Sequence, residues 1–158
     1  MSMSKAEYSV DLASRSDVIN VAENLRGADE AELKAMWGRD IDKFQALRQC
    51  WMVQRSTTFV GKVDGKPVMI FGVKPGEVLA PVARPWMVAT PELEEHAVAF
   101  LRASKSMVEV WSQAFPIMEN WVYRENTEAV RWLQWLGFNV YYPEPFGPDN
   151  LPFHRFDM

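Results

Sequence analysis

Residues 116–140, PIMENWVYRENTEAVRWLQWLGFNV, constrain the fold more than any other part of the chain. Their first part, 118–123, mixes aromatic and β-branched residues, which is typical of a buried strand. Apolar residues then recur at the spacing of one helical face, and Asn126 offers a side-chain acceptor to the free amides at the helix start. Gly137 ends the helix, because glycine accepts the left-handed conformation after the last turn. A further aromatic and β-branched run, 138–142, follows, so the stretch predicts strand, helix and strand.

The rest of the sequence predicts an α/β fold with one domain over residues 1–158, in which helices flank a mixed central β-sheet. Asp64-Gly65 lies between two apolar runs and predicts a hairpin, since glycine takes positive φ in a tight turn. The other expected strands are 8–13, 57–63, 67–73, 84–89 and 151–156. The other expected helices are three pieces between 14 and 55, and a long helix from Pro91, capped by Thr90, to about 115.

Three finer expectations concern the ends of these elements. Ser14, Ser16 and Asp17 are cap candidates for the first helical piece, which Gly27 ends. Asp29 caps the second piece. Residues 143–152, PEPFGPDNLP, form a proline-rich loop.

The spacing from Asn126 through Ala129-Val130 to Gly137-Phe138 resembles the last βαβ unit of the GNAT acyltransferase fold. The upstream order of elements agrees with that fold over most of the chain. A closer resemblance is to the small internal virion proteins of short-tailed bacteriophages, which have a GNAT-like pattern themselves. The residues that carry it are Trp86-Met87-Val88, Asn120-Trp121-Val122, Asn126-Thr127 and Gly137.

The region that would hold the diphosphate of acetyl-CoA departs from the GNAT pattern. In that family a loop of the form Arg/Gln-x-x-Gly-x-Gly/Ala lets backbone amides approach the phosphates at a helix start. Here the region reads VATPELEEHAVAF, without a glycine between Val88 and Phe100. Glu92, Glu94 and Glu95 stabilise a helix start through its dipole but repel a diphosphate. The sequence therefore predicts a degenerate cofactor loop.

Catalytic groups are also difficult to assign. Many GNAT enzymes carry a tyrosine seven residues after the asparagine as general acid, and Leu133 stands there; Tyr123 is the substitute to consider against a plain strand residue. Glu77 and Glu119 are candidate bases, although each is more simply a surface charge. The remaining polar candidates are His96 within helical reach of Glu92, and a pair of His154 with Asp157. The prediction is no catalytic residue.

Composition restricts the class of protein. The chain has 17 basic and 21 acidic residues and a net charge of −4, which argues against nucleic acid as the main partner. No apolar run approaches the roughly 18 residues of a membrane span, and the first residues lack the apolar core of a signal peptide. Cys50 is the single cysteine, so synthesis in a reducing cytoplasm is expected. Two distant histidines and one cysteine predict no metal site.

The phage resemblance implies a virion structural or internal protein with a non-catalytic GNAT fold and no cofactor. It would be made in the host bacterial cytoplasm and contact portal, tail or internal core proteins in the virion, with symmetric assembly left open. Trp37, Trp111 and Phe146 are candidate contact residues. The alternative is a CoA-dependent N-acetyltransferase with an unusual cofactor loop, in which backbone amides at Val88, Ala89 and Thr90 and the Asn126 side chain hold acetyl-CoA. A host-directed effector that binds a bacterial protein is a third reading.

Overall fold

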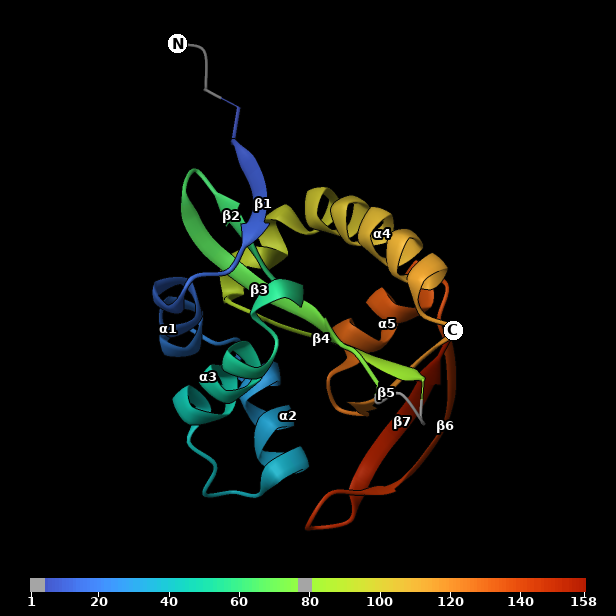
Figure 1. The fold of residues 1–158 in the computed structure, drawn as a ribbon. Helices are drawn as coiled ribbons and strands as arrows, with labels where there is room; N and C mark the ends of the chain where they lie inside the picture. The colour runs from blue at the N-terminus through green and yellow to red at the C-terminus, as the bar shows by residue number, and fades with distance from the viewer. Residues whose placement is uncertain (1–4, 77–80) are drawn as a thin grey trace.

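The computed structural model describes residues 5–76 and 81–158, which form seven strands and five α-helices around one mixed sheet (Figure 1). The strands are β1 Tyr8–Leu12, β2 Thr58–Val63, β3 Lys66–Lys74, β4 Val82–Ala89, β5 Ile117–Tyr123, β6 Asn139–Phe146 and β7 Leu151–Asp157. The helices are α1 Arg15–Glu23, α2 Gly27–Trp37, α3 Lys43–Val53, α4 Ala97–Ala114 and α5 Thr127–Leu136, with 3-10 turns η1 Arg55–Thr57 and η2 Pro91–His96. No helix in the described part of the chain is both long and apolar enough to cross a membrane.

The sheet has the order β1-β2-β3-β4-β5-β7-β6. Every neighbouring pair is antiparallel except β4 and β5, which run parallel. A parallel neighbour requires a crossover, and η2 with α4 provides it. The mixed α/β arrangement expected from the sequence is thereby confirmed.

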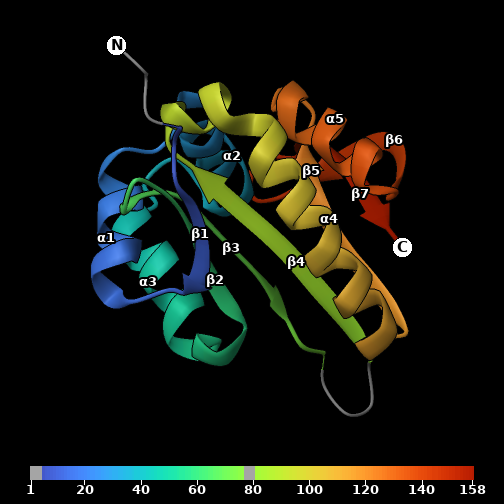
Figure 2. The same ribbon diagram turned by 90° about the horizontal axis from the view of Figure 1, so that it is seen from above.

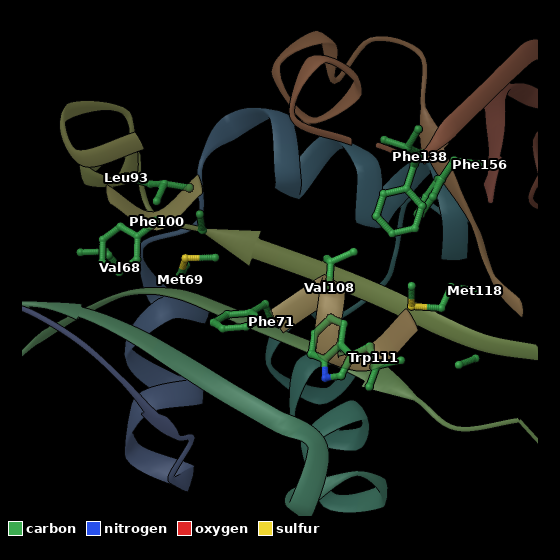
Figure 3. Packing of buried hydrophobic residues seen from close by; sticks show 14 of the residues in the cluster. Val68, Met69, Phe71, Leu93, Phe100, Val108, Trp111, Met118, Phe138 and Phe156 are labelled. Atoms are coloured by element: carbon green, nitrogen blue, oxygen red, sulfur yellow. The ribbon is translucent and has the colours of Figure 1, made fainter. Parts of the chain in front are cut away.

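Two helical layers cover the two faces of the sheet (Figure 2). On one face, α4 and α5 pack over a cluster that includes Phe71, Phe100 and Trp111 (Figure 3). On the other face, α1 and α3 pack over Val60, Ile70 and neighbouring residues. The sheet separates the two clusters, and the seven inner residues of β3 are all buried because both faces of this strand are covered.

Several local predictions are confirmed. Asp64 and Gly65 have φ of 49° and 78°, as a tight hairpin between β2 and β3 requires. Ser14 caps α1 in a capping box: its hydroxyl accepts the Asp17 N–H at 3.2 Å, and the Asp17 carboxylate accepts the Ser14 N–H at 2.9 Å. Gly137 follows α5 in the left-handed conformation, with φ of 101°.

Other predictions at element ends are wrong. Gly27 begins α2 instead of ending the first helix, and Asp29 lies within the first turn of α2. The expected loop 143–152 is largely strand, because β6 extends to Phe146 past a register shift between Val140 and Pro143. Such an irregularity allows prolines in an edge strand, where a missing amide costs no ladder bond.

The aromatic residues expected at an interface differ in exposure. Trp111 is 9% exposed and belongs to the core, so its prediction as a contact residue is wrong. Phe146 is half-buried, and its ring stacks on Trp121 at 4.6 Å. Trp37 is 61% exposed at the end of α2.

Candidate functional site

β4 and β5 separate after a short contact at their first residues. They pair only at Val82–Ile117 and Ala83–Met118. Directly after β4, the Thr90 N–H donates to the Val68 oxygen of β3 at 2.9 Å. Hydrogen-bonded and non-hydrogen-bonded pairs alternate along an antiparallel ladder, so the even-numbered residues of β4 direct their backbone groups toward β3. The N–H and C=O of Met87, an odd-numbered residue, therefore face the space between β4 and β5.

A groove of about 350 Å³ lies next to this part of β4. Residues of β4, η2, α4 and α5 line it, together with Arg26 before α2. The apolar lining residues include Met87, Leu93, Leu101 and Trp132, and the charged ones are Arg26, Glu94, Glu128 and Arg131. The groove therefore combines apolar lining residues with two arginines and two glutamates.

A buried polar cluster lies at the end of the gap where β4 and β5 have separated, next to Ala89 and Tyr123. The Arg26 guanidinium is held by both carboxylate oxygens of Asp29 at 3.1 Å. It also donates to the Asn126 Oδ1 at 3.1 Å and the Glu128 Oε2 at 2.6 Å, and its Nη1 is 3.9 Å from Glu94. Arg26, Asp29 and Asn126 are 6%, 1% and 1% exposed. Asp29 and Arg26 are thus paired and hydrogen-bonded, as buried charges must be.

Helix α2 joins the ends of both diverging strands through this cluster. At the end of β4, the Ala89 N–H donates to Asp29 Oδ2 at 2.8 Å, and the Ala89 oxygen accepts the Arg26 N–H at 2.8 Å. At the end of β5, the Tyr123 N–H donates to Glu32 Oε1 at 2.7 Å. Acidic residues three positions apart lie on one face of a helix, which explains how Asp29 and Glu32 reach neighbouring strands.

Glu32 differs electrostatically from the other acids of the cluster. Burial, opposed by the Tyr123 hydrogen bond and reinforced by the Asp29 charge, raises the pKa of Glu32 to about 7 from its ordinary 4.5. Its Oε2 accepts the Asn126 Nδ2 at 3.1 Å. Asp29, Glu94 and Glu128 all have Arg26 as an ion-pair partner. Glu32 is therefore a carboxyl group that changes protonation near neutral pH.

The cofactor-binding residues expected under the alternative reading are close together but differ in availability. Asn126 occupies the position before α5 without a side-chain capping bond, so the prediction that its side chain caps this helix is wrong. Its amide instead binds Arg26, Asp29 and Glu32. The Val88 amide faces β3, the Thr90 amide is bonded to Val68, and that of Ala89 is bonded to Asp29. Met87, absent from that prediction, offers the backbone groups that face the gap.

The region expected to form a cofactor loop is the 3-10 turn η2. Thr90 precedes it without a side-chain capping bond, and the helix expected from Pro91 becomes regular only at Ala97. Leu93 is 1% exposed and anchors the turn in the core. The Thr90 Oγ1 is buried without a hydrogen-bond partner. The absence of glycine thus produces a closed, packed turn in place of a loop that wraps phosphates.

The other sequence candidates lie apart from the groove. The Glu119 carboxylate pairs with Arg155 at 3.1 Å, and the Leu133 side chain packs against the core. The His96 Nδ1 lies 2.8 Å from the Tyr8 hydroxyl. The half-buried Tyr123 has its ring 5.2 Å from that of Phe153. Glu77 lies outside the described residues.

The expected His154–Asp157 pair does not form. The His154 Nδ1 lies 2.7 Å from the Tyr141 oxygen, whereas Asp157 accepts bonds from Tyr141, Asn139 and Arg155. Within 5–76 and 81–158, no group of three or more His, Cys, Asp or Glu side chains is placed to hold a metal ion.

Sequence reasoning missed Arg26, Asp29 and Glu32. Their spacing, Arg-x-x-Asp-x-x-Glu, places all three on one side of a helix, and this was the available signal. An amphipathic helix normally presents such charges to solvent, so the spacing alone does not reveal that the side is buried.

No protein-family model matches the sequence, and no curated protein matches it. Solved structures match it over nearly its whole length. YncA, a putative acetyltransferase from Salmonella typhimurium solved with acetyl-CoA, has a TM-score of 0.67 and 13% identity over 96% of this chain and 92% of its own. Ard1 from Thermoplasma volcanium has a TM-score of 0.70 and 15% identity over 96% of both chains. A GCN5-related N-acetyltransferase from Kribbella flavida has 0.69 and 20%, again over 96% of both.

These likenesses show that the chain has the GNAT fold, as the Asn126 to Phe138 spacing predicted. They also correct the functional expectation. The structural neighbours include a ribosomal-protein-alanine N-acetyltransferase from Brucella melitensis and the GCN5-related N-acetyltransferase from Kribbella flavida. The resemblance to phage internal virion proteins finds no support among the neighbours. The leading prediction of a non-catalytic virion component is therefore wrong, and the alternative acetyltransferase reading agrees better with the comparisons.

Proposed function

We propose that this chain is an N-acyltransferase that uses an acyl-coenzyme A thioester as donor and a primary amine as acceptor. The observation that carries the proposal is the gap between β4 and β5 with the groove beside it. Parallel strands that stay together saturate each other's backbone groups, whereas these strands separate after two residue pairs. The Met87 N–H and C=O are left facing the gap, where an extended amide-containing ligand can pair with them.

The groove fits the pantetheine part of the donor. An arm of methylene and amide groups needs an apolar wall and backbone partners, which Leu101, Trp132 and the Met87 backbone offer. When bound, the thioester supplies an activated acyl carbonyl. The buried Thr90 Oγ1 without a partner is a further polar atom beside the end of β4.

The diphosphate part of the donor has no phosphate-wrapping loop in this chain, so another group must contact it. The closed turn η2 cannot wrap it, and Glu94 and Glu128 at the groove edge oppose a negative ligand. Arg131 of α5 lines the same groove, and no ion pair among the described residues involves it. We assign the diphosphate contact to the Arg131 guanidinium, which suits phosphate oxygens because its donors form a planar fork.

The test is calorimetric titration of the chain with acetyl-CoA at neutral pH. We expect a micromolar dissociation constant for the unchanged protein. Ala129→Phe puts a ring into the groove and should weaken binding at least about tenfold, since displaced contacts worth 1.4 kcal/mol correspond to that factor.

Val110→Phe is the matched control. Val110 is 61% exposed on α4 and does not line the groove, so this variant should bind as the unchanged protein does. Circular dichroism of both variants would show that they remain folded. No heat at millimolar acetyl-CoA, or equal binding by the two variants, would contradict the proposal.

A further inference from the structure

Transfer of an acyl group to an amine requires a group that accepts a proton, and this inference rests on the function proposed above. A primary amine is mostly protonated at neutral pH, and its nitrogen attacks only after losing a proton. We propose that Glu32 is the general base of this chain. The Glu32 carboxylate would accept the proton from the acceptor amine at the open end of the gap between β4 and β5.

The geometry fixes this carboxylate on two sides. Oε1 accepts the Tyr123 N–H at 2.7 Å, and Oε2 accepts the Asn126 Nδ2 at 3.1 Å. A carboxylate has about four lone-pair positions, so each oxygen keeps capacity for a further donor. Glu32 as a whole residue is of intermediate exposure, so it is not sealed in the hydrophobic core. Glu32 is therefore oriented without being saturated.

The charges around Glu32 support the same role. The groups that face it are Asp29 and Arg26 from the start of α2, the Tyr123 amide from β5 and the Asn126 amide before α5. Arg26 is bonded to Asp29, Asn126 and Glu128, so its charge is largely compensated by other acids. Burial therefore dominates and holds the pKa of Glu32 near 7, which is where a base is most effective at neutral pH.

The step replaces one C–S bond with one C–N bond. Glu32 takes one proton from the ammonium group, and the freed nitrogen lone pair forms the C–N bond as the C–S bond breaks. The second proton of that nitrogen leaves with the thiolate sulfur, which gives an amide and a free thiol. Glu32 then returns its proton to water. No oxidant or metal is needed.

A first test needs no substrate. The chemical shift of the Tyr123 amide, followed by NMR across pH, reports the protonation of Glu32 because this N–H donates to its carboxylate. We expect a transition near pH 7 in the unchanged protein, none in Glu32→Gln, and an unaltered one in Glu30→Gln. Glu30 is the matched control on the same helix, 38% exposed and paired loosely with Lys34 and Lys43 at 3.8 and 4.0 Å. A transition near pH 4 to 5 would overturn the proposal.

The second test measures thiol release from acetyl-CoA in the presence of spermidine and of peptides with free amines. Glu32→Gln should lower the rate about 10²- to 10⁴-fold, the usual contribution of a general base. Its acetyl-CoA affinity should stay unchanged, and Glu30→Gln should keep full activity. Undiminished release by Glu32→Gln, or no release by an unchanged protein that binds acetyl-CoA, would refute the role of Glu32. Failure to bind acetyl-CoA at all would instead refute the proposed function.

Discussion

A single guanidinium, that of Arg26, lies among the carboxylates of Asp29, Glu128 and Glu94 and the amide of Asn126. Its side chain is 7% exposed, and that of Asp29 is 1% exposed. Two charges taken out of water are tolerated only while each has the other. Arg26 therefore serves the structure as well as the groove it lines.

Replacement of Arg26 by methionine keeps the length of the side chain but leaves the buried Asp29 without its cation. We expect a loss of about 3–5 kcal/mol in the free energy of unfolding, measured by urea denaturation. Arg124→Ala is the control, because the Arg124–Glu125 pair is more than half exposed on both sides and is worth at most about 1 kcal/mol. Equal stability of the two variants would mean that Asp29 is solvated or protonated in the folded state.

At the scale of elements, the β6–β7 hairpin packs against the end of α2. Gly147 in its turn has φ of 79°, and a Cβ there would stand 2.5 Å from the Ala35 backbone oxygen. Gly65 in the β2–β3 turn has nearly the same φ, 78°, but a Cβ there would meet nothing within 4 Å. The two glycines thus share a positive φ and differ in what lies next to them.

Alanine at these two glycines separates conformational strain from steric contact. Gly65→Ala should cost about 1–2 kcal/mol of unfolding free energy, the penalty for the left-handed conformation. Gly147→Ala should cost about 1–3 kcal/mol more, because the hairpin must move away from α2. Both are measured by thermal and urea denaturation. Similar losses in the two variants would show that the hairpin can shift on α2 without cost.

For the molecule as a whole, Glu32 makes stability depend on pH. Its pKa is about 7 in the folded state against 4.5 ordinarily, so between these values the folded state holds a proton that the unfolded state has lost. Stability must then fall as pH rises from about 5 to 7, by up to the order of 3 kcal/mol, and level off above. Asp157 has a lowered pKa and acts only at lower pH, outside this window.

Urea denaturation at pH 5, 6, 7 and 8 measures this dependence. The unchanged protein should lose stability from pH 5 to 7 and little more at pH 8, whereas Glu32→Gln should show no such slope because its amide does not titrate. A constant free energy of unfolding in the unchanged protein would show that Glu32 titrates alike in the folded and unfolded chain.

Much of this molecule could be predicted from its sequence. The runs around Asp64-Gly65 and from 116 to 140 have local signals that tertiary contacts reinforce, and the GNAT-like order of elements followed from them. Local rules failed where tertiary contacts compete. The Asn126 side chain makes no capping bond because its amide is hydrogen-bonded to the buried Arg26 and Asp29. An unsatisfied polar group inside the protein costs more free energy than an uncapped helix start that water can reach.

The site itself was mostly beyond sequence reasoning. Asp29 and Glu32 belong to α2, and Asn126 stands about a hundred positions away, so nothing local indicates that they meet. The absence of a phosphate-wrapping loop at η2 is predictable from the sequence, because residues 89–99 contain no glycine. The gap between β4 and β5 is not predictable in this way, because the lack of a glycine loop carries no information about how these two strands pair.

The position of β7 has a consequence for how the protein is made. A ribosome delivers β6 first, yet β7 lies between it and β5, and Phe153 and Phe156 are buried there at 0% and 4% exposure. Until residues 151–157 emerge, the sixth strand has no neighbour to join and β5 lacks a cover on that flank. A chain whose synthesis stalls or ends before residue 151 therefore exposes two unpaired strand edges, those of β5 and β6. Chaperones and proteases recognise exposed edges of this kind.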